Sequence, residues 1–109
     1  MKKLLIALTL VMSSQVHSAT ITCTEINVQE VRVEGTRDDN HFFSNKLVIE
    51  LDQSCGGKKH AHAALDHPAF DGFLSIILAA KASGSEIIIS INTDNLPQIS
   101  NQIAWVGIE

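Results

Sequence analysis

Tyrosine is absent from the sequence, proline occurs twice, and a single tryptophan accompanies four phenylalanines. Signatures of catalysis are also missing. There is no Gly-x-Ser-x-Gly segment, and the serines have no recognisable His and Asp partners for nucleophilic catalysis. The paired carboxylates Asp38 and Asp39 lie in a charged turn after Gly35, where contact with solvent is expected rather than glycosidase chemistry. We therefore predict a protein that is not an enzyme and uses no cofactor.

Basic residues are scarce, because eight Lys and Arg stand against twelve Asp and Glu and form no stripe. A surface for nucleic acid or for anionic membranes needs clustered cations, so neither partner is expected. The apolar run from Leu4 to Met12 is far shorter than the roughly 20 residues that a helix needs to cross a bilayer. No membrane span is therefore predicted.

The first nineteen residues have the order of a secretory signal peptide: Lys2 and Lys3, the apolar run, then small polar residues. The lysine-led start is of bacterial type, so we expect a secreted or periplasmic protein, cleaved after Ser18 or Ala19. Cleavage would leave residues 20–109 as one small domain, with six basic and twelve acidic residues and a net charge of −6.

Only two cysteines are present, Cys23 and Cys55, and they lack the Cys-x-x-Cys spacing of metal sites. In an exported chain such a pair predicts one disulfide. It would close a loop of about 30 residues and contribute roughly 3 kcal/mol. Two free or metal-bound thiols are the alternative.

Apolar alternation predicts a first strand region from Thr20 to Gly35. The alternation slips once between Cys23 and Ile26 and again between Val28 and Val31. A bulge or bend tolerates such slips, so we expect one long curved strand or two short strands nearly in line.

Three later segments have the composition of strands: 46–52, 86–92 and 102–109. In the last of them, Ile103 and Trp105 are expected on one face, and Val106 on the other. Residues 53–64 contain Gly56 and Gly57 and are predicted to form a loop.

One segment is predicted to be a helix, from Pro68 to Ser83, with Asp66 able to cap its start and Gly84 its end. Large residues share one face: Phe70, Phe73, Leu74 and Ile77. The opposite face holds small residues: Gly72, Ser75, Ala79 and Ala82. Water or a loop of the same chain could cover this small face. Because so small a domain can hardly bury both sides of a helix, we expect neighbouring copies to cover it in a homo-oligomer.

The order strand–strand–(strand)–helix–strand–strand predicts a mainly β fold with one helix. A small five-stranded barrel of the OB (oligonucleotide/oligosaccharide-binding) type fits this order. An α+β antiparallel sheet with the helix packed on one face is the alternative.

The segments FDGFLSIILAAKASGSEIIISI and NQIAWVGIE resemble the B subunits of AB5 toxins of the subtilase cytotoxin and typhoid toxin type. Shared features are a helix ending in a small-polar-glycine step, a β-branched strand, a proline-containing loop and a last strand, here Ile103 to Ile108. The resemblance covers Phe70 to Ile108. It implies an OB fold, a ring-shaped homopentamer with helices around a central pore, and glycan binding on the outer surface.

The same resemblance implies that a hydroxyl on the first strand contacts the sugar, and Thr24 could supply it. Two features depart from the toxin family: no tyrosine can help to hold the sugar, and the Cys23/Cys55 pair differs from the family's hairpin disulfide. An exported domain that binds a partner protein is therefore the alternative function.

A second alternative is metal binding, because His60, His62, Asp66 and His67 lie within eight residues. Imidazole and carboxylate groups are ligands for Zn²⁺, Ni²⁺ or Cu²⁺, and in an extended segment His60 and His62 point the same way. A solvated polar loop that leads into the helix would explain the same residues.

Overall fold

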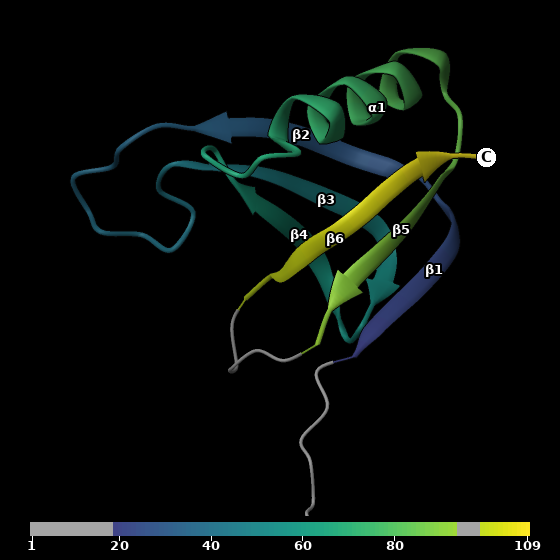
Figure 1. Cartoon of the computed structure of the whole chain (residues 1–109), viewed down its shortest axis with the longest axis horizontal. Coiled ribbons are helices and arrows are strands. Elements are labelled where there is room, and N and C mark those ends of the chain that lie inside the picture. Colours follow the sequence, from purple (N-terminus) through teal and green to yellow (C-terminus); the bar gives the residue numbers. More distant parts are fainter. Residues whose placement is uncertain (1–18, 94–98) are drawn as a thin grey trace, which may run out of the picture.

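The computed structural model describes residues 19–93 and 99–109, and within them the fold is mainly β with one helix, as predicted (Figure 1). The elements are β1 (Thr20–Ile26), β2 (Val28–Glu34), β3 (Lys46–Cys55), β4 (Lys58–Ala64), α1 (Phe70–Ser83), β5 (Ile87–Asn92) and β6 (Asn101–Ile108). Of the predicted signal peptide, only Ala19 falls inside the described residues.

The strands form one mixed sheet in the order β1-β5-β6-β4-β3-β2. Neighbouring strands are antiparallel except β4 and β6, which are parallel. In the described part of the chain no ladder joins β1 to β2, so this six-stranded sheet is not closed into a barrel. The predicted five-stranded barrel is corrected accordingly, and the alternative, an α+β sheet with one helix, describes the fold.

A corner at Asn27 explains why the first strand region does not close the sheet. β1 pairs with β5 and β2 pairs with β3, so two strands separated by one residue lie at opposite sheet edges. The Asp52 carboxylate accepts hydrogen bonds from the Asn27 backbone N–H (3.0 Å) and side-chain amide (3.1 Å). Asp52 in turn donates its backbone N–H to the Asn27 carbonyl (3.0 Å). The corner thus holds the two edges near each other without a ladder between them.

Both predicted register slips in the first strand region are confirmed. The pairing of β1 with β5 shifts between Cys23 and Ile26, where Glu25 has a φ of 57°, and the pairing of β2 with β3 shifts between Val28 and Glu30. The structure therefore selects two short strands rather than one long one. Cys23, beside the first bulge, forms the predicted disulfide with Cys55 at the end of β3.

The predicted loop at residues 53–64 is wrong, because β3 and β4 form a hairpin there. Gly56 and Gly57 make the two-residue turn, with φ of 67° and 83°, as the tight hairpin turns require. The β4 sequence, Lys-Lys-His-Ala-His-Ala-Ala, has weak intrinsic strand preference. Pairing with β3 on one side and β6 on the other stabilises it as a strand.

The helix begins two residues later than predicted and has no side-chain cap. His67 closes the preceding turn instead of Asp66, because its Nδ1 accepts the Ala69 N–H (2.9 Å) and its carbonyl accepts the Phe70 N–H (3.0 Å). Gly84 ends the helix in the left-handed conformation (φ 71°), as predicted.

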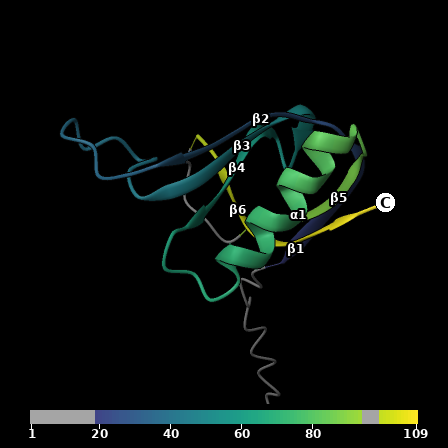
Figure 2. The same ribbon diagram turned by 90° about the horizontal axis from the view of Figure 1, so that it is seen from above.

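The large-residue face of α1 packs on the concave side of the sheet, against β2 and β6 (Figures 1 and 2). Phe73 and Ile77 are buried, and Phe70 and Leu74 are partly buried against the same core. Each fully buried side chain of this size contributes roughly 1.5–3 kcal/mol. The other buried members of the core come mainly from the strands: Ile26, Val28, Leu47, Ile49, Leu51, Cys55, Ala61, Ala63, Ala80, Ile87, Ile89, Ile91, Ile103 and Val106.

Candidate functional site

A bulge in β6 places Trp105 on the outside of the sheet. Ser90 pairs with Trp105 and Ile91 pairs with Ile103, so Ala104 has no partner across the ladder. The extra residue reverses the alternation, and Ile103 (1% exposed) and Val106 (8%) both face the core. Trp105 is 45% exposed. The expectation that Ile103 and Trp105 share a face is therefore wrong.

Trp105 lies in register with two hydroxyl residues on the neighbouring strands. Ser90 of β5 is opposite Trp105, and Thr22 of β1 is opposite Ser90. The Thr22 hydroxyl donates to Ser90 Oγ at 3.2 Å. Ser90 is fully buried between these neighbours, whereas Thr22 is exposed. The Thr22 oxygen is therefore held in place, and it keeps lone pairs that can accept a ligand hydroxyl.

Thr24, the residue assigned by resemblance, lies on the same side of the sheet as Thr22. Successive side chains of a strand alternate between its faces, so Thr20, Thr22 and Thr24 form one outward row on β1, and all three are exposed. Asn92, opposite Thr20, donates its side-chain amide to Gln102 Oε1 (3.1 Å). We define the threonine–tryptophan face as these outward residues: Thr20, Thr22, Thr24, Ser90, Asn92, Gln102 and Trp105.

The threonine–tryptophan face can bind but supplies no acid–base chemistry of its own, because none of its residues titrates near neutral pH. Its hydroxyls and amides both donate and accept hydrogen bonds. The indole provides a large apolar surface with limited rotational freedom. A flat apolar ring beside neutral hydrogen-bonding groups suits a ligand that itself combines an apolar face with hydroxyls.

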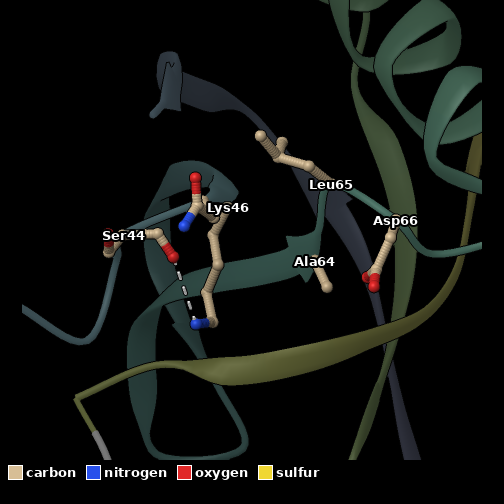
Figure 3. A pocket seen from close by; sticks show the side chains of 6 residues that line it. Ser44, Lys46, Ala64, Leu65 and Asp66 are labelled. Carbon is tan, nitrogen blue, oxygen red and sulfur yellow. Dashed lines mark hydrogen bonds between the residues drawn. The ribbon is translucent and has the colours of Figure 1, made fainter. Parts of the chain in front are cut away.

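A shallow pocket of about 450 Å³ lies elsewhere, between the start of β3 and the end of β4 (Figure 3). Its cationic group is already engaged, because Lys46 Nζ donates to the carbonyls of Phe42 (2.8 Å) and Ser44 (3.5 Å). The Ser44 hydroxyl also accepts the Arg37 backbone N–H (2.8 Å). These contacts hold the chain of the protein itself, so the pocket offers a ligand few free polar groups. The lining residues are Ser44, Asn45, Lys46, Ala64, Leu65 and Asp66.

The loop at residues 35–45 extends beyond the sheet (Figure 1). Its Phe42 and Phe43 fold back against His62 and His60 on the outer side of β4. The Phe42 ring meets the His62 ring edge-on, with centroids 4.9 Å apart, and the Phe43 ring lies 5.9 Å from that of His60. Phe43, Val48 and His62 are buried there, outside the main core. The loop therefore has a small hydrophobic cluster of its own.

Ion pairs attach the same loop to the outer edge of β2. Arg32 binds Glu30 (2.6 Å) and Glu34 (2.7 Å), and Arg37 binds Glu34 (2.7 Å) and Asp39 (2.6 Å). Hydrogen bonds from Arg37 and Arg32 hold the pKa of Glu34 below its usual value, and Arg37 does the same for Asp39. β2 is an edge strand with free backbone groups, and these charged side chains disfavour its pairing with a strand of another chain.

The three histidines that the sequence suggested as metal ligands contact other groups in the structure. His62 Nδ1 lies 2.8 Å from Ser100 Oγ, and His67 Nδ1 is bonded to the Ala69 N–H. His60 and His62 share a face of β4, as expected, but both pack against phenylalanines. Within residues 19–93 and 99–109, no three His, Cys, Asp or Glu side chains are grouped so that they could hold a metal ion.

Burial lowers the pKa of His62 to about 4, and the positive charges of Lys46 and Lys58 act in the same direction. His62 is therefore neutral under ordinary conditions. Its uncharged ring can bond Ser100 and pack against Phe42 without bringing a charge under the loop.

The small-residue face of α1 is exposed, since Gly72, Ser75, Ala79 and Ala82 are all accessible. Leu78, on the flank of that face, is 48% exposed. No described segment of the same chain covers these residues, which removes one of the explanations that the sequence left open.

Sequence reasoning named Thr24 but missed Trp105, Thr22 and Ser90. Their alternation along the strands was visible, but the Ala104 bulge that turns Trp105 outward was not. In the described part of the chain, no helix is long and apolar enough to cross a membrane. No protein-family model matches the chain, and a search of curated proteins finds no significant match.

Proposed function

We propose that the chain is an exported, non-catalytic binding module whose threonine–tryptophan face recognises a glycan. The observation that carries the proposal is the exposure of Trp105 (45%) beside in-register hydroxyl residues. Aromatic side chains provide much of the contact energy at recognition sites, and a half-exposed indole offers a surface of that kind. The position of Thr24 on the same face, and the resemblance of Phe70–Ile108 to toxin B subunits, support the same function.

The proposal includes assembly of several copies through the small-residue face of α1, with a pentamer as the form that the resemblance implies. Small side chains allow another backbone to approach closely, and water is a poor partner for so apolar a helix. Several copies would also present several glycan sites at once, which raises the avidity of weak individual sites.

The test is a glycan array probed with the exported form of the protein, and with Trp105→Ala beside it. The wild-type protein should bind a defined subset of glycans. Trp105→Ala should bind them at least about tenfold more weakly, because it removes the stacking surface. Val33→Ala is the matched control, since Val33 is 50% exposed on β2, away from this face, and its loss should leave binding unchanged.

Two outcomes would contradict the proposal. Equal binding by Trp105→Ala and the wild type would remove the threonine–tryptophan face from the function. If no glycan bound, the alternative of an exported protein-interaction domain would replace glycan recognition, and co-purification from the same compartment would become the relevant experiment.

A further inference from the structure

The two ends of the threonine–tryptophan face have different charged neighbours. Gln102, at one end, pairs with His62, which has Lys46 and Lys58 as its charged neighbours, whereas the other end, beyond Gly107, is acidic. The face has only neutral residues on all three strands, including the outward Ile88 and Gly107 next to those already named. At the acidic end stand three exposed carboxylate residues, Glu25, Glu86 and Glu109. The whole chain is also acidic, with a formal charge of −4, or −6 without residues 1–19.

Two hydrogen bonds fix Glu109 at the end of the face, one through its carboxylate and one through its backbone. The Glu25 backbone N–H, in the β1 bulge, donates to Glu109 Oε1 (2.7 Å). The Glu109 backbone N–H donates to the Glu86 carbonyl (3.1 Å). The carboxylate of Glu109 is therefore tied to β1, near Thr24, rather than free to swing away. An anionic ligand on this face would meet a fixed negative charge.

Gly107 leaves a position without a side chain near Trp105. Gly107 follows Trp105 by two residues, so it shares the outward side of β6, and it pairs with Ile88. A Cβ built at Gly107 would meet no atom within 4 Å. Position 107 thus leaves space on the outward side of β6, two residues from the indole.

Resting on the proposed function, we propose that the saccharide bound at the threonine–tryptophan face is uncharged. Its apolar ring face stacks on Trp105 above Gly107, and its hydroxyls bond Thr22, Thr24 and the amides of Asn92 and Gln102. A carboxylated or sulfated sugar gains most from a cation, because hydrogen bonds between two charged groups are shorter and stronger than those from neutral donors. This face provides none and places Glu109 beside the ligand instead. Like charges brought together at an interface weaken binding.

The experiment compares a neutral glycan with its acidic counterpart: a lactose-terminated oligosaccharide and the same oligosaccharide with a terminal sialic acid. Binding is followed by the fluorescence of Trp105, the one tryptophan in the chain, and by calorimetry. The neutral glycan should shift the emission and bind at least about tenfold more tightly than the acidic one. Affinity for the neutral glycan should not change with salt, since no ion pair forms.

Gly107→Gln tests the position of the sugar ring, because it places a side chain where the ring is proposed to lie. It should weaken binding of the neutral glycan at least about tenfold and leave the unfolding midpoint nearly unchanged. Gly35→Gln is the matched control: a Cβ there also meets no atom within 4 Å, but Gly35 lies in the 35–45 loop. The control should bind like the wild type.

The outcomes separate this inference from the proposed function. Tighter binding of the sialylated glycan, with the same loss in Trp105→Ala, would overturn the neutral-sugar inference and leave glycan recognition standing. Normal binding by Gly107→Gln would show that the sugar ring does not lie above Gly107. Absence of binding by both glycans in this assay, together with an empty glycan array, would overturn the proposed function itself.

Discussion

A single unpaired residue, Ala104, decides the chemistry of one side of this sheet. If β6 ran through Ala104 without a bulge, Trp105 would lie on the same face as Ile103 and Val106 would face outward. With the bulge, the indole is exposed and an isoleucine and a valine fill the core. A β-bulge re-aims side chains in this way, and a sequence window cannot show where the extra residue falls. The alternation of the sequence alone therefore placed Trp105 on the wrong face of β6.

The two glycines of the β3–β4 turn differ in what surrounds them. Both have positive φ, so any side chain there is strained. A Cβ at Gly56 would lie 2.5 Å from Ile91 Cδ1 and 2.9 Å from Asn101 Nδ2, whereas at Gly57 it would meet nothing within 4 Å. We expect Gly57→Ala to lower the free energy of unfolding by about 1 kcal/mol. Gly56→Ala should lower it by about 2–4 kcal/mol, because overpacking adds to strain.

Chemical unfolding of the two variants, followed by circular dichroism, checks this prediction. Gly57→Ala serves as the control, since it has the backbone strain without the clash. Equal unfolding midpoints would mean that Ile91 and Asn101 move aside without cost, and that the turn does not pack against β5 and β6.

At the scale of elements, the 35–45 loop and β4 form a unit that depends on a neutral histidine. His62 lies beneath Phe42, bonded to Ser100, with Lys46 and Lys58 as the charged groups that lower its pKa. The sequence showed three histidines near a helix and suggested a metal site. Only the pairing of β4 with β3 placed His62 under the loop. Its role follows from burial, which the local pattern does not reveal.

Acidification should weaken the fold through His62. Above about pH 6.5 the ring is neutral in both the folded and the unfolded chain, so stability does not depend on it. Below that pH His62 becomes protonated in the unfolded chain but stays neutral in the folded chain, where its pKa is about 4. The free energy of unfolding should therefore fall as pH drops from about 6.5 to about 4, by on the order of 2–3 kcal/mol in all.

Urea unfolding at a series of pH values measures this slope, and His62→Asn is the matched variant. Asn can still bond Ser100 but does not titrate, so its unfolding free energy should be flatter between pH 6.5 and 5. In that interval the carboxylates with lowered pKa, Glu34, Asp39 and Asp52, remain ionised in the folded chain. An equal slope in the variant and the wild type would remove His62 as the cause.

At the scale of the molecule, one side of α1 packs on the sheet and the other side meets nothing described in its own chain. Ala79→Glu places a charge at the centre of the small-residue face. Because Ala79 is exposed and Glu is a good helix former, the monomer should keep its stability to within about 0.5–1 kcal/mol. Assembly should weaken, since a buried unpaired carboxylate is costly at an interface.

Light scattering with size-exclusion chromatography measures the mass of both proteins. Lys81→Glu is the control, because it adds a carboxylate at another exposed position of the same helix and should leave the mass unchanged. A monomeric wild-type protein would contradict assembly. An Ala79→Glu protein of wild-type mass would place the contact elsewhere.

The sequence by itself determined the local features that depend on a few neighbouring residues. Apolar alternation located strands β1, β2, β3 and β6, a β-branched run located β5, and Gly84 located the end of the helix. The register slips near Cys23 and Val28 and the disulfide were also predicted, and the structure confirms them. Each of these depends on backbone preference, side-chain period or the count of cysteines.

Only the tertiary structure decided the features that depend on partners distant in the chain. β4 is a strand because β3 and β6 flank it, although its own residues favour no strand. The sheet stays open because the Asn27 corner sends β1 and β2 to different partners. The Ala104 bulge brings Trp105 into register with Ser90 and Thr22 on the outer face. Pairing across strands is a non-local interaction, so its register, and with it the candidate site, is set by the whole sheet rather than by any one segment.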